Sequence, residues 1–282
     1  MKRFENIILA SDIDGTFLTS VQEGKQRNRA AIEYFKEQGG HFTFATGRNY
    51  RQILAAIPEA PELTNLPAVT CNGASLYDFQ KQEEVLRYLM NVETVRELIN
   101  WLAEQDPTVG VRGATEQNFL FTSLENPFIQ RDFEALRSQQ ARVVPIEQWK
   151  DYSLYKLAVR ANEDTLERLR PRMEEQFRGR LEITQSDPTL VDVQADGRTK
   201  AALLRELTQR SEISSPYLCV AGDYDNDLAM LRVADLACCP SNAQPCVKAI
   251  CHRTVCHYRE GAIADIIEYL DRCFKKGEEY DR

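Results

Sequence analysis

The chain has 282 residues, with 35 Lys and Arg against 43 Asp and Glu, so its formal net charge is -8 at pH 7. This balance argues against a protein that binds nucleic acids or other polyanions, because such proteins carry a basic stripe or tail. Hydrophobic residues make up 43% of the chain, which suffices for one large or two modest domains and excludes a disordered or fibrous protein.

The N-terminal region contains neither a membrane span nor a signal peptide. Its longest apolar run, Ile7 to Ala10, ends close to Asp12 and Asp14 and is far shorter than the roughly 18 residues of a spanning helix. Eight cysteines without a signal peptide indicate a reducing compartment, in which cysteines act as small hydrophobic residues. We therefore predict a cytoplasmic protein without a membrane partner.

The first eighty residues alternate apolar strands with helices. We expect strands at residues 6–11, 41–45 and 67–71, and helices at 28–38 and 50–57. Such alternation indicates β-α-β units and a parallel sheet, whose functional loops lie at the carboxyl ends of its strands. Asp12, Thr46 and Asn72 all follow such strand ends.

The pattern changes at residue 83 and returns near Gly197. Between these points we expect strands at 84–90, 109–111, 119–122, 156–160, 181–185 and 190–194, with helices at 92–105, 127–138 and 163–177. After it we expect helices at 199–209, from about 225 and at 262–274, with strands at 217–221, 236–239 and 254–255. The predicted fold is an α/β protein with a Rossmann-like parallel-sheet core, residues 1–82 and 193–282, into which an α+β domain, residues 83–192, is inserted.

Two acidic clusters follow apolar strands of the predicted core. Asp12 ends the first strand and Asp14 is two residues further on, so both carboxylates lean to the same side of an extended backbone. The second cluster, residues 221–227, supplies Asp223, Asn226 and Asp227. Helix capping is the alternative explanation for the second cluster, but two clusters at two strand ends of one sheet favour a site for a hard cation such as Mg²⁺.

Two further elements are suited to binding an anion. Thr46 and Gly47 follow the second strand, where a hydroxyl and free backbone N–H groups at a helix N-terminus form a small anion site. Lys200 lies at the start of a predicted helix, where the helix dipole disfavours a cation, so a nearby anion would compensate it. By spacing alone, a solvated surface lysine is an equally good interpretation.

The four elements D-x-D-G-T, T-G-R, an isolated Lys and G-D-x-x-N-D, in this order, resemble the haloacid dehalogenase superfamily of phosphohydrolases. The insertion between Thr46 and Lys200 is similar to the α/β cap of its Cof-type subclass IIB branch, also called a C2B-type cap. Asn72-Gly73-Ala74 and Asn242-Ala243 are similar to further elements of that branch. The resemblance covers nearly the whole chain.

The resemblance implies a role for each matched residue. Asp12 would be the nucleophile that forms an aspartyl-phosphate, and Asp14 the general acid and base. The carboxylates of Asp12 and Asp223 and the backbone carbonyl of Asp14 would hold Mg²⁺, with Asp227 supporting them. The remaining matched residues would bind phosphate or lie on the substrate side; the phosphate-binding set is Thr46, Gly47, Lys200 and Asn226, and the substrate-side set is Asn72 and Asn242.

Other polar residues have simpler interpretations. Cys and His near residues 246–257 suggest zinc, but their spacing does not fit a closed structural site. Arg112 and Lys156 in the insertion could face a phosphate site, although solvated side chains are the simpler interpretation. Trp101 and Trp149 are expected in a core or an interface rather than as sugar platforms.

We therefore predict a Mg²⁺-dependent phosphatase that acts on a small phosphorylated metabolite, with sugar phosphates favoured, as a monomer or a homodimer without a nucleic-acid partner. A sugar phosphomutase of the same subclass is the first alternative. A non-catalytic metabolite-binding protein is the second, and it is disfavoured because both Asp12 and Asp14 are present.

Overall fold

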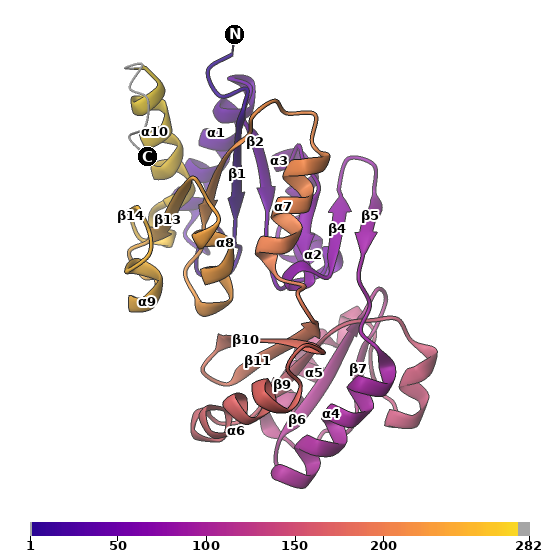
Figure 1. Cartoon of the computed structure of the whole chain (residues 1–282). Coiled ribbons are helices and arrows are strands. Elements are labelled where there is room, and N and C mark those ends of the chain that lie inside the picture. Colours follow the sequence, from indigo (N-terminus) through magenta and orange to yellow (C-terminus); the bar gives the residue numbers. More distant parts are fainter. Residues whose placement is uncertain (1, 276–282) are drawn as a thin grey trace. The chain divides into compact units, whose positions relative to one another are not determined.

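The computed structural model describes residues 2–275, which form two compact units (Figure 1). One unit contains the chain up to Val85 and from Lys200 onward, and the other is Leu86–Thr199. The sequence placed the limits of the insertion at residues 83 and 192. The second unit begins at Leu86 and ends at Thr199, and its last strand continues to Ala195, which is paired with Leu181.

The first unit is built on a five-stranded parallel sheet with the strand order β14-β13-β12-β1-β2. The strands are β1 Ile7–Ser11, β2 His41–Phe44, β12 Tyr217–Ala221, β13 Leu236–Pro240 and β14 Arg253–Val255. The chain leaves β1 toward β2 on one side and later fills the other side with β12, so β1 lies at the point where the strand order reverses. In open α/β sheets, ligands bind outside the carboxyl ends of the strands at this point.

Helices cover both faces of this sheet. On one face, α1 Gln22–Glu37 and α10 Ala262–Lys275 contact each other, and Ile32 and Ile266 join Leu9 in one apolar cluster. Because side chains alternate along a strand, Ile8 and its neighbours at alternate positions point to the other face. There α8 Leu228–Arg232 contacts β12 and β13, and α7 Lys200–Arg210 packs beside α8 (Figure 1).

A small second sheet with the order β3-β4-β5 continues this unit. It consists of β3 Ala68–Thr70, β4 Ser75–Asp78 and β5 Glu83–Arg87. The third predicted strand therefore does not extend the parallel sheet: β3 pairs with β4 in the antiparallel sense and joins the main sheet through a single parallel bridge from Val69 to Ala45. The short helices α2 Tyr50–Ala56, α3 Ala60–Leu63 and α9 Pro245–Lys248 occupy the connections.

The second unit contains a six-stranded sheet with the order β10-β11-β9-β6-β7-β8. Its strands are β6 Gly110–Thr115, β7 Phe119–Phe121, β8 Ala141–Val143, β9 Leu154–Arg160, β10 Leu181–Asp187 and β11 Leu190–Ala195. Val111, Leu157 and Val193 belong to one apolar cluster that also includes residues of α4 Val92–Gln105 and α6 Glu163–Gln176. On the opposite face, Phe121 packs with Ile129 of α5 Pro127–Leu136.

All three helices of the second unit begin at an asparagine. The side-chain oxygens of Asn91, Asn126 and Asn162 accept hydrogen bonds from backbone N–H groups of the first turns of α4, α5 and α6. Such N-caps satisfy donors that have no partner within the helix. These caps explain why the three helices begin where they do.

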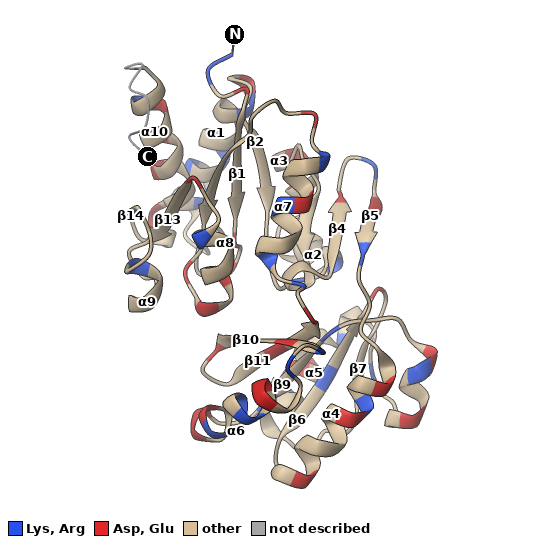
Figure 2. Ribbon diagram, in the orientation of Figure 1, with Lys and Arg blue, Asp and Glu red and all other residues tan. Residues whose placement is uncertain are grey.

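Trp149 is fully buried in the apolar interior of the second unit, and the half-buried Trp101 packs against the same cluster and contacts Phe177 edge-on. Figure 2 shows acidic and basic residues interspersed along the ribbons of each unit. Among the described residues, no helix combines the length and the apolar character needed to cross a membrane.

Candidate active site

Three loops of the first unit meet where the central strands end. Asp12 follows β1, and its backbone N–H donates to the carbonyl of Ala221 at the end of β12 at 2.8 Å. Thr46 follows β2, and its N–H donates to the carbonyl of Val69 at 2.9 Å. These hydrogen bonds fix the starts of the loops to the neighbouring strands, so the loops carry their side chains on rigid supports.

Three carboxylates gather at this edge. Asp12, Asp223 and Asp227 each offer an oxygen, and these oxygens lie within 4.8 Å of one another. Lys200 is only 1% exposed, and its Nζ donates to Oδ1 of Asp12 at 2.6 Å and to Oδ1 of Asp227 at 2.7 Å. The interpretation of Lys200 as a solvated surface residue is therefore wrong, because it is the buried cation of the carboxylate cluster.

The electrostatics of the cluster follow from burial and crowding. Burial raises the pKa of Asp12 well above its ordinary value; Lys200 acts to lower it, while Asp227 and Asp223 raise it further. Burial and then the charge of Asp227 raise the pKa of Asp223 to about 7. Burial alone would lower the pKa of Lys200, but Asp12 and Asp227 more than offset this effect and raise it. The single ammonium of Lys200 thus cannot neutralise the charge of all three carboxylates.

The chemistry of the donor set fits a metal ion. All three candidate ligands offer oxygen, the donor that hard divalent cations prefer. Three carboxylates share one ammonium in this cluster, and a divalent cation would neutralise the remaining negative charge. Within residues 2–275, this is the one group of three or more Asp, Glu, His or Cys side chains close enough together to hold a metal.

Asp227 also shapes the loop that carries Asp223. Its Oδ2 accepts hydrogen bonds from the backbone N–H groups of Asp223 at 2.9 Å and Tyr224 at 3.2 Å. A Cβ at position 222 would lie 2.6 Å from the Cβ of Asp227, so only glycine fits there. Asp227 thus links Lys200 to the backbone of the loop.

The loop after β1 contacts Asp223 directly. Thr16 Oγ1 donates to Asp223 Oδ1 at 2.7 Å. Gly15 has a φ of +78°, and a Cβ there would lie 2.3 Å from Asp223 Oδ2. The D-G-T triplet therefore combines a left-handed turn, a close approach and a hydroxyl donor. The sequence did not assign Thr16 a role, although its position next to Gly15 was a signal for one.

Asp14 lies apart from the buried carboxylates. Its side chain is 58% exposed, and both of its oxygens accept hydrogen bonds from Arg48, Oδ2 from Nε at 2.7 Å and Oδ1 from Nη2 at 2.6 Å. The hydrogen bond to Asp14 raises the pKa of Arg48. Arg48 was noted as part of the T-G-R element, but its ion pair with Asp14 was not predicted from the sequence.

The predicted phosphate-binding residues of the second loop lie close to a strained segment. Thr46 is buried, its Oγ1 accepts a hydrogen bond from the N–H of Arg48 at 3.2 Å, and Gly47 lies between them. The N–H of Asn72 donates to the carbonyl of Thr46 at 2.9 Å. Cys71 and Asn72 both have positive φ values, 51° and 57°, which few non-glycine residues adopt.

The two remaining predicted site residues differ in their surroundings. Asn226 is half-buried in the turn between Asp225 and Asp227. The side chain of Asn242 donates to the carbonyl of Gly15 at 2.9 Å and accepts from the N–H of Tyr258 at 3.2 Å. Asn242 therefore connects the loop after β1 to the segment before α10.

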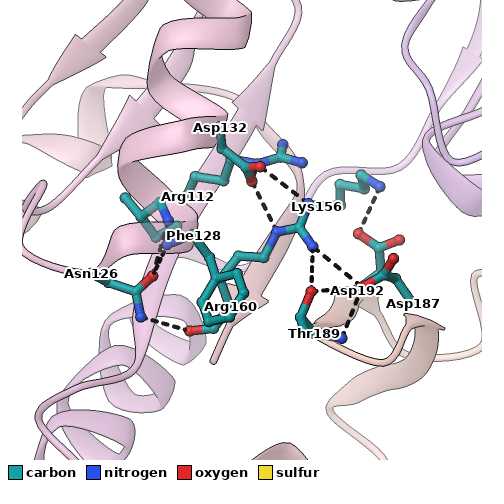
Figure 3. Close-up of polar contacts among 10 residues, drawn as sticks. Arg112, Asn126, Phe128, Asp132, Lys156, Arg160, Asp187, Thr189 and Asp192 are labelled. Atoms are coloured by element: carbon teal, nitrogen blue, oxygen red, sulfur yellow. Dashed lines mark hydrogen bonds and ion pairs between the residues drawn. The ribbon is translucent and has the colours of Figure 1, made fainter. Parts of the chain in front are cut away.

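The insertion carries a network of charged residues along its sheet (Figure 3). Arg112 donates to Asp132 at 2.6 Å and Lys156 to Asp192 at 2.7 Å, and these two cations are only 8% and 6% exposed. Arg160 also donates to Asp132 through two nitrogens. The interpretation of Arg112 and Lys156 as solvated side chains is therefore wrong, because each is held by a carboxylate of its own unit.

The Cys- and His-containing segment near the C-terminus makes local contacts. His252 Nδ1 accepts a hydrogen bond from the N–H of Ala237 at 2.8 Å, and His257 Nδ1 accepts from that of Arg259 at 3.3 Å. All eight cysteines are free thiols. Both histidines therefore accept hydrogen bonds from backbone N–H groups and stabilise the local structure.

Comparison with known proteins agrees with this geometry. A family model described as haloacid dehalogenase-like hydrolase matches residues 9–267. The 5-amino-6-(5-phospho-D-ribitylamino)uracil phosphatase YcsE of Bacillus subtilis is 26% identical over 243 residues, covering 86% of each chain. The phosphatase YbjI of Escherichia coli, which carries the same activity name, is 22% identical over 277 residues, covering 98% of each chain.

Solved structures share the fold. The subclass IIB sugar phosphatase BT4131 superposes with a TM-score of 0.78 at 21% identity, covering 94% of this chain and 98% of that chain. A haloacid dehalogenase-like hydrolase from Bacteroides thetaiotaomicron superposes with a TM-score of 0.77 at 21% identity, covering 93% and 98%. At this identity the likeness concerns the fold alone.

The parallel sheet carries acidic loops at its switch point, and a second unit is inserted into the chain. This architecture is that of a class of α/β hydrolases. The chain belongs to the haloacid dehalogenase-like hydrolases, whose family model covers most of its length. The predicted family, fold class and enzyme class, a haloacid dehalogenase phosphatase, are thereby confirmed.

Proposed function

We propose that the protein is a Mg²⁺-dependent phosphatase that hydrolyses phosphomonoesters of small metabolites through an aspartyl-phosphate on Asp12. The observation that carries the proposal is the position of Asp12, which follows the central strand, accepts a hydrogen bond from the ammonium of Lys200 and lies in one cluster with the carboxylates of Asp223 and Asp227. A buried carboxylate held in this way is a suitable nucleophile, because its oxygen is fixed and positive charge is available beside it.

In the first half of the reaction, an oxygen of Asp12 attacks phosphorus and the ester oxygen leaves. Attack by an anion on a phosphate dianion requires cations that reduce the repulsion. Lys200 supplies one positive charge at 2.6 Å from Asp12, and the hydroxyl of Thr46 and the backbone N–H of Gly47 provide neutral donors to the phosphoryl oxygens. Asp14 gives a proton to the leaving oxygen.

In the second half, Asp14 takes a proton from the water that attacks the aspartyl-phosphate, which releases inorganic phosphate and restores Asp12. The exposure of Asp14 supports this role, because the residue must meet both a leaving group and a water molecule. Asp12, Asp223 and the backbone carbonyl of Asp14 would hold Mg²⁺, which when bound supplies charge neutralisation and orientation of the phosphoryl group.

The substrate class follows from the relatives rather than from the site. Two relatives are named as phosphatases of a phosphorylated ribityl compound, and one structural neighbour is titled a sugar phosphatase. We propose a phosphorylated sugar or sugar alcohol, free or attached to a small base, as the substrate. We also propose a cytoplasmic location, which the eight free thiols support.

The test is phosphate release from a panel of sugar and sugar-alcohol phosphates, ranked by kcat/KM, with Mg²⁺ and with EDTA. We expect activity that requires Mg²⁺ and is lost at least about 10⁴-fold in Asp12→Asn, because the covalent route is then closed. Asp225→Asn is the matched control, since it makes the same change on the loop of Asp223 without touching the carboxylate cluster.

Activity that survives in Asp12→Asn would refute the mechanism. An isomeric sugar phosphate in place of inorganic phosphate would identify a phosphomutase instead. Tight binding of a sugar phosphate with no turnover in Mg²⁺ would point to a binding protein.

A further inference from the structure

The exposed carboxylate of Asp14 is held by one guanidinium in a two-point contact. Nε and Nη2 of Arg48 donate to the two oxygens at 2.7 and 2.6 Å. A planar fork on a planar carboxylate fixes the orientation of the carboxylate as well as its position. Exposed ion pairs contribute little to stability, so stability alone does not account for this arrangement.

The backbone of Arg48 is fixed independently of Asp14. Its N–H donates to Thr46 Oγ1, and its carbonyl accepts from the N–H of Cys71 at 2.9 Å. Cys71 and Asn72 are in the left-handed region, at a cost of order 1–3 kcal/mol each. The loop of Arg48 therefore rests on a strained, buried support, and the guanidinium projects from a rigid base.

The proposed role of Asp14 requires a fixed orientation. The residue must present one oxygen first to the leaving group and then to water, whereas a half-exposed aspartate can rotate about two side-chain bonds. Each carboxylate oxygen has two lone pairs, so the two hydrogen bonds from Arg48 leave one on each oxygen for proton transfer. Arg48 thus restricts rotation and leaves the reactive positions open.

We propose that Arg48 is a positioning residue for Asp14, which holds the general acid and base in its working orientation. This inference rests on the proposed phosphatase function. Without the two hydrogen bonds from Arg48, the Asp14 carboxylate can rotate. Proton transfer to a poor leaving group, and from the attacking water, then becomes slower. Attack by Asp12 on an ester with a good leaving group does not need that proton and keeps its rate.

The test compares an alkyl phosphate with 4-nitrophenyl phosphate in Arg48→Gln and Arg48→Lys. For the alkyl phosphate we expect kcat to fall about 10- to 100-fold in both variants, because a displacement of the order of 1 Å has such an effect. For 4-nitrophenyl phosphate we expect a burst of one nitrophenolate per site at nearly the wild-type rate, followed by a slow steady state. Arg51→Gln, in helix α2 shortly after Arg48 and over the ring of Tyr50, is the control and keeps wild-type kinetics in both assays.

Two results would overturn the proposal. If the nitrophenolate burst slows as much as alkyl phosphate turnover, Arg48 has a general structural role. If Arg48→Lys keeps more than about half of kcat, a positive charge suffices to position Asp14 and the two-point hydrogen bonding of the guanidinium is not needed. Failure of the proposed function is a separate outcome, since wild-type protein would then release no phosphate in Mg²⁺ or Asp12→Asn would stay active.

Discussion

At the scale of single residues, Lys200 balances the buried charge of the site. Its ammonium lies within 2.7 Å of Asp12 and Asp227, and all three side chains are almost fully buried. Taking such groups out of water is costly, and their mutual attraction offsets the cost only while both signs are present. The site is therefore held together by the same lysine that would bind the phosphoryl group.

We predict that Lys200→Met lowers the free energy of unfolding by about 3–5 kcal/mol in metal-free buffer, because buried carboxylates are then left without a cation. Urea unfolding at pH 7 in EDTA, followed by far-UV circular dichroism, measures the change. Lys248→Met, at an exposed position, is the control and should stay within about 0.5 kcal/mol of wild type. Equal stability of the two variants would contradict the assigned role of Lys200.

At the scale of elements, the sequence predicted strongly patterned segments well. The predicted strand at residues 217–221 and the helix at 92–105 have the bounds observed for β12 and α4. The three-residue strand β8 and the four-residue strand β4 were not predicted. Helix α1 begins six residues earlier than predicted, since Val21 precedes it without a side-chain cap to mark the start.

Residues of the candidate site could be predicted where they follow the carboxyl ends of parallel strands. Asp12, Thr46 and Asp223 follow β1, β2 and β12, and adjacent parallel strands bring their ends together. The pair of Arg48 and Asp14 was not predictable in this way, because a long side chain reaching between two loops leaves no spacing in the sequence. The ion pairs of Arg112 and Lys156 were missed for the same reason, since their partners are 20 and 36 residues away.

The buried pair of Lys156 and Asp192 gives a prediction on pH. Burial acts to raise the pKa of Asp192, but Lys156 and Ser186 more than offset it, so the pKa lies below its ordinary value of 3.8. A carboxyl group with a depressed pKa stabilises the folded state fully above its unfolded pKa, and this contribution is lost as the pH falls through the folded pKa. The stabilisation by Asp192 is therefore complete above about pH 4.

We predict that Asp192→Asn lowers the free energy of unfolding of the second unit by about 3–5 kcal/mol at pH 7, because Lys156 is left buried without its partner. The difference from wild type should stay constant above about pH 4 and shrink as the pH is lowered further, through the depressed pKa of Asp192. Tryptophan fluorescence is a selective probe, since both tryptophans, Trp101 and Trp149, lie in this unit. A difference that is independent of pH, or as small as that of the exposed Glu175→Gln, would contradict the prediction.

At the scale of the whole molecule, each unit has apolar clusters of its own. One large cluster lies within the first unit, and two others lie within Leu86–Thr199. All residues of the carboxylate cluster belong to the first unit. A ligand of that cluster should therefore stabilise the first unit directly.

We predict that Mg²⁺ at about 100 times its dissociation constant stabilises the first unit by about 2.7 kcal/mol through mass action. Far-UV circular dichroism, which reports on both units, should show a component that shifts with Mg²⁺, whereas the tryptophan fluorescence transition should stay in place. The shift should disappear in Asp223→Asn. A Mg²⁺-dependent shift of equal size in both signals would show that the units unfold as one.

The central claim is that phosphate passes through a covalent bond to Asp12, and borohydride trapping tests it most directly. Asp14→Asn protein is mixed with Mg²⁺ and 4-nitrophenyl phosphate, whose leaving group needs no proton from residue 14. The sample is quenched in acid and treated with borohydride, which reduces an acyl-phosphate of aspartate to homoserine. We predict homoserine at position 12 in peptide mass spectra, with none in Asp12→Asn or without substrate. Phosphate release by the wild-type protein combined with an unmodified Asp12 in every trapped sample would contradict the covalent mechanism.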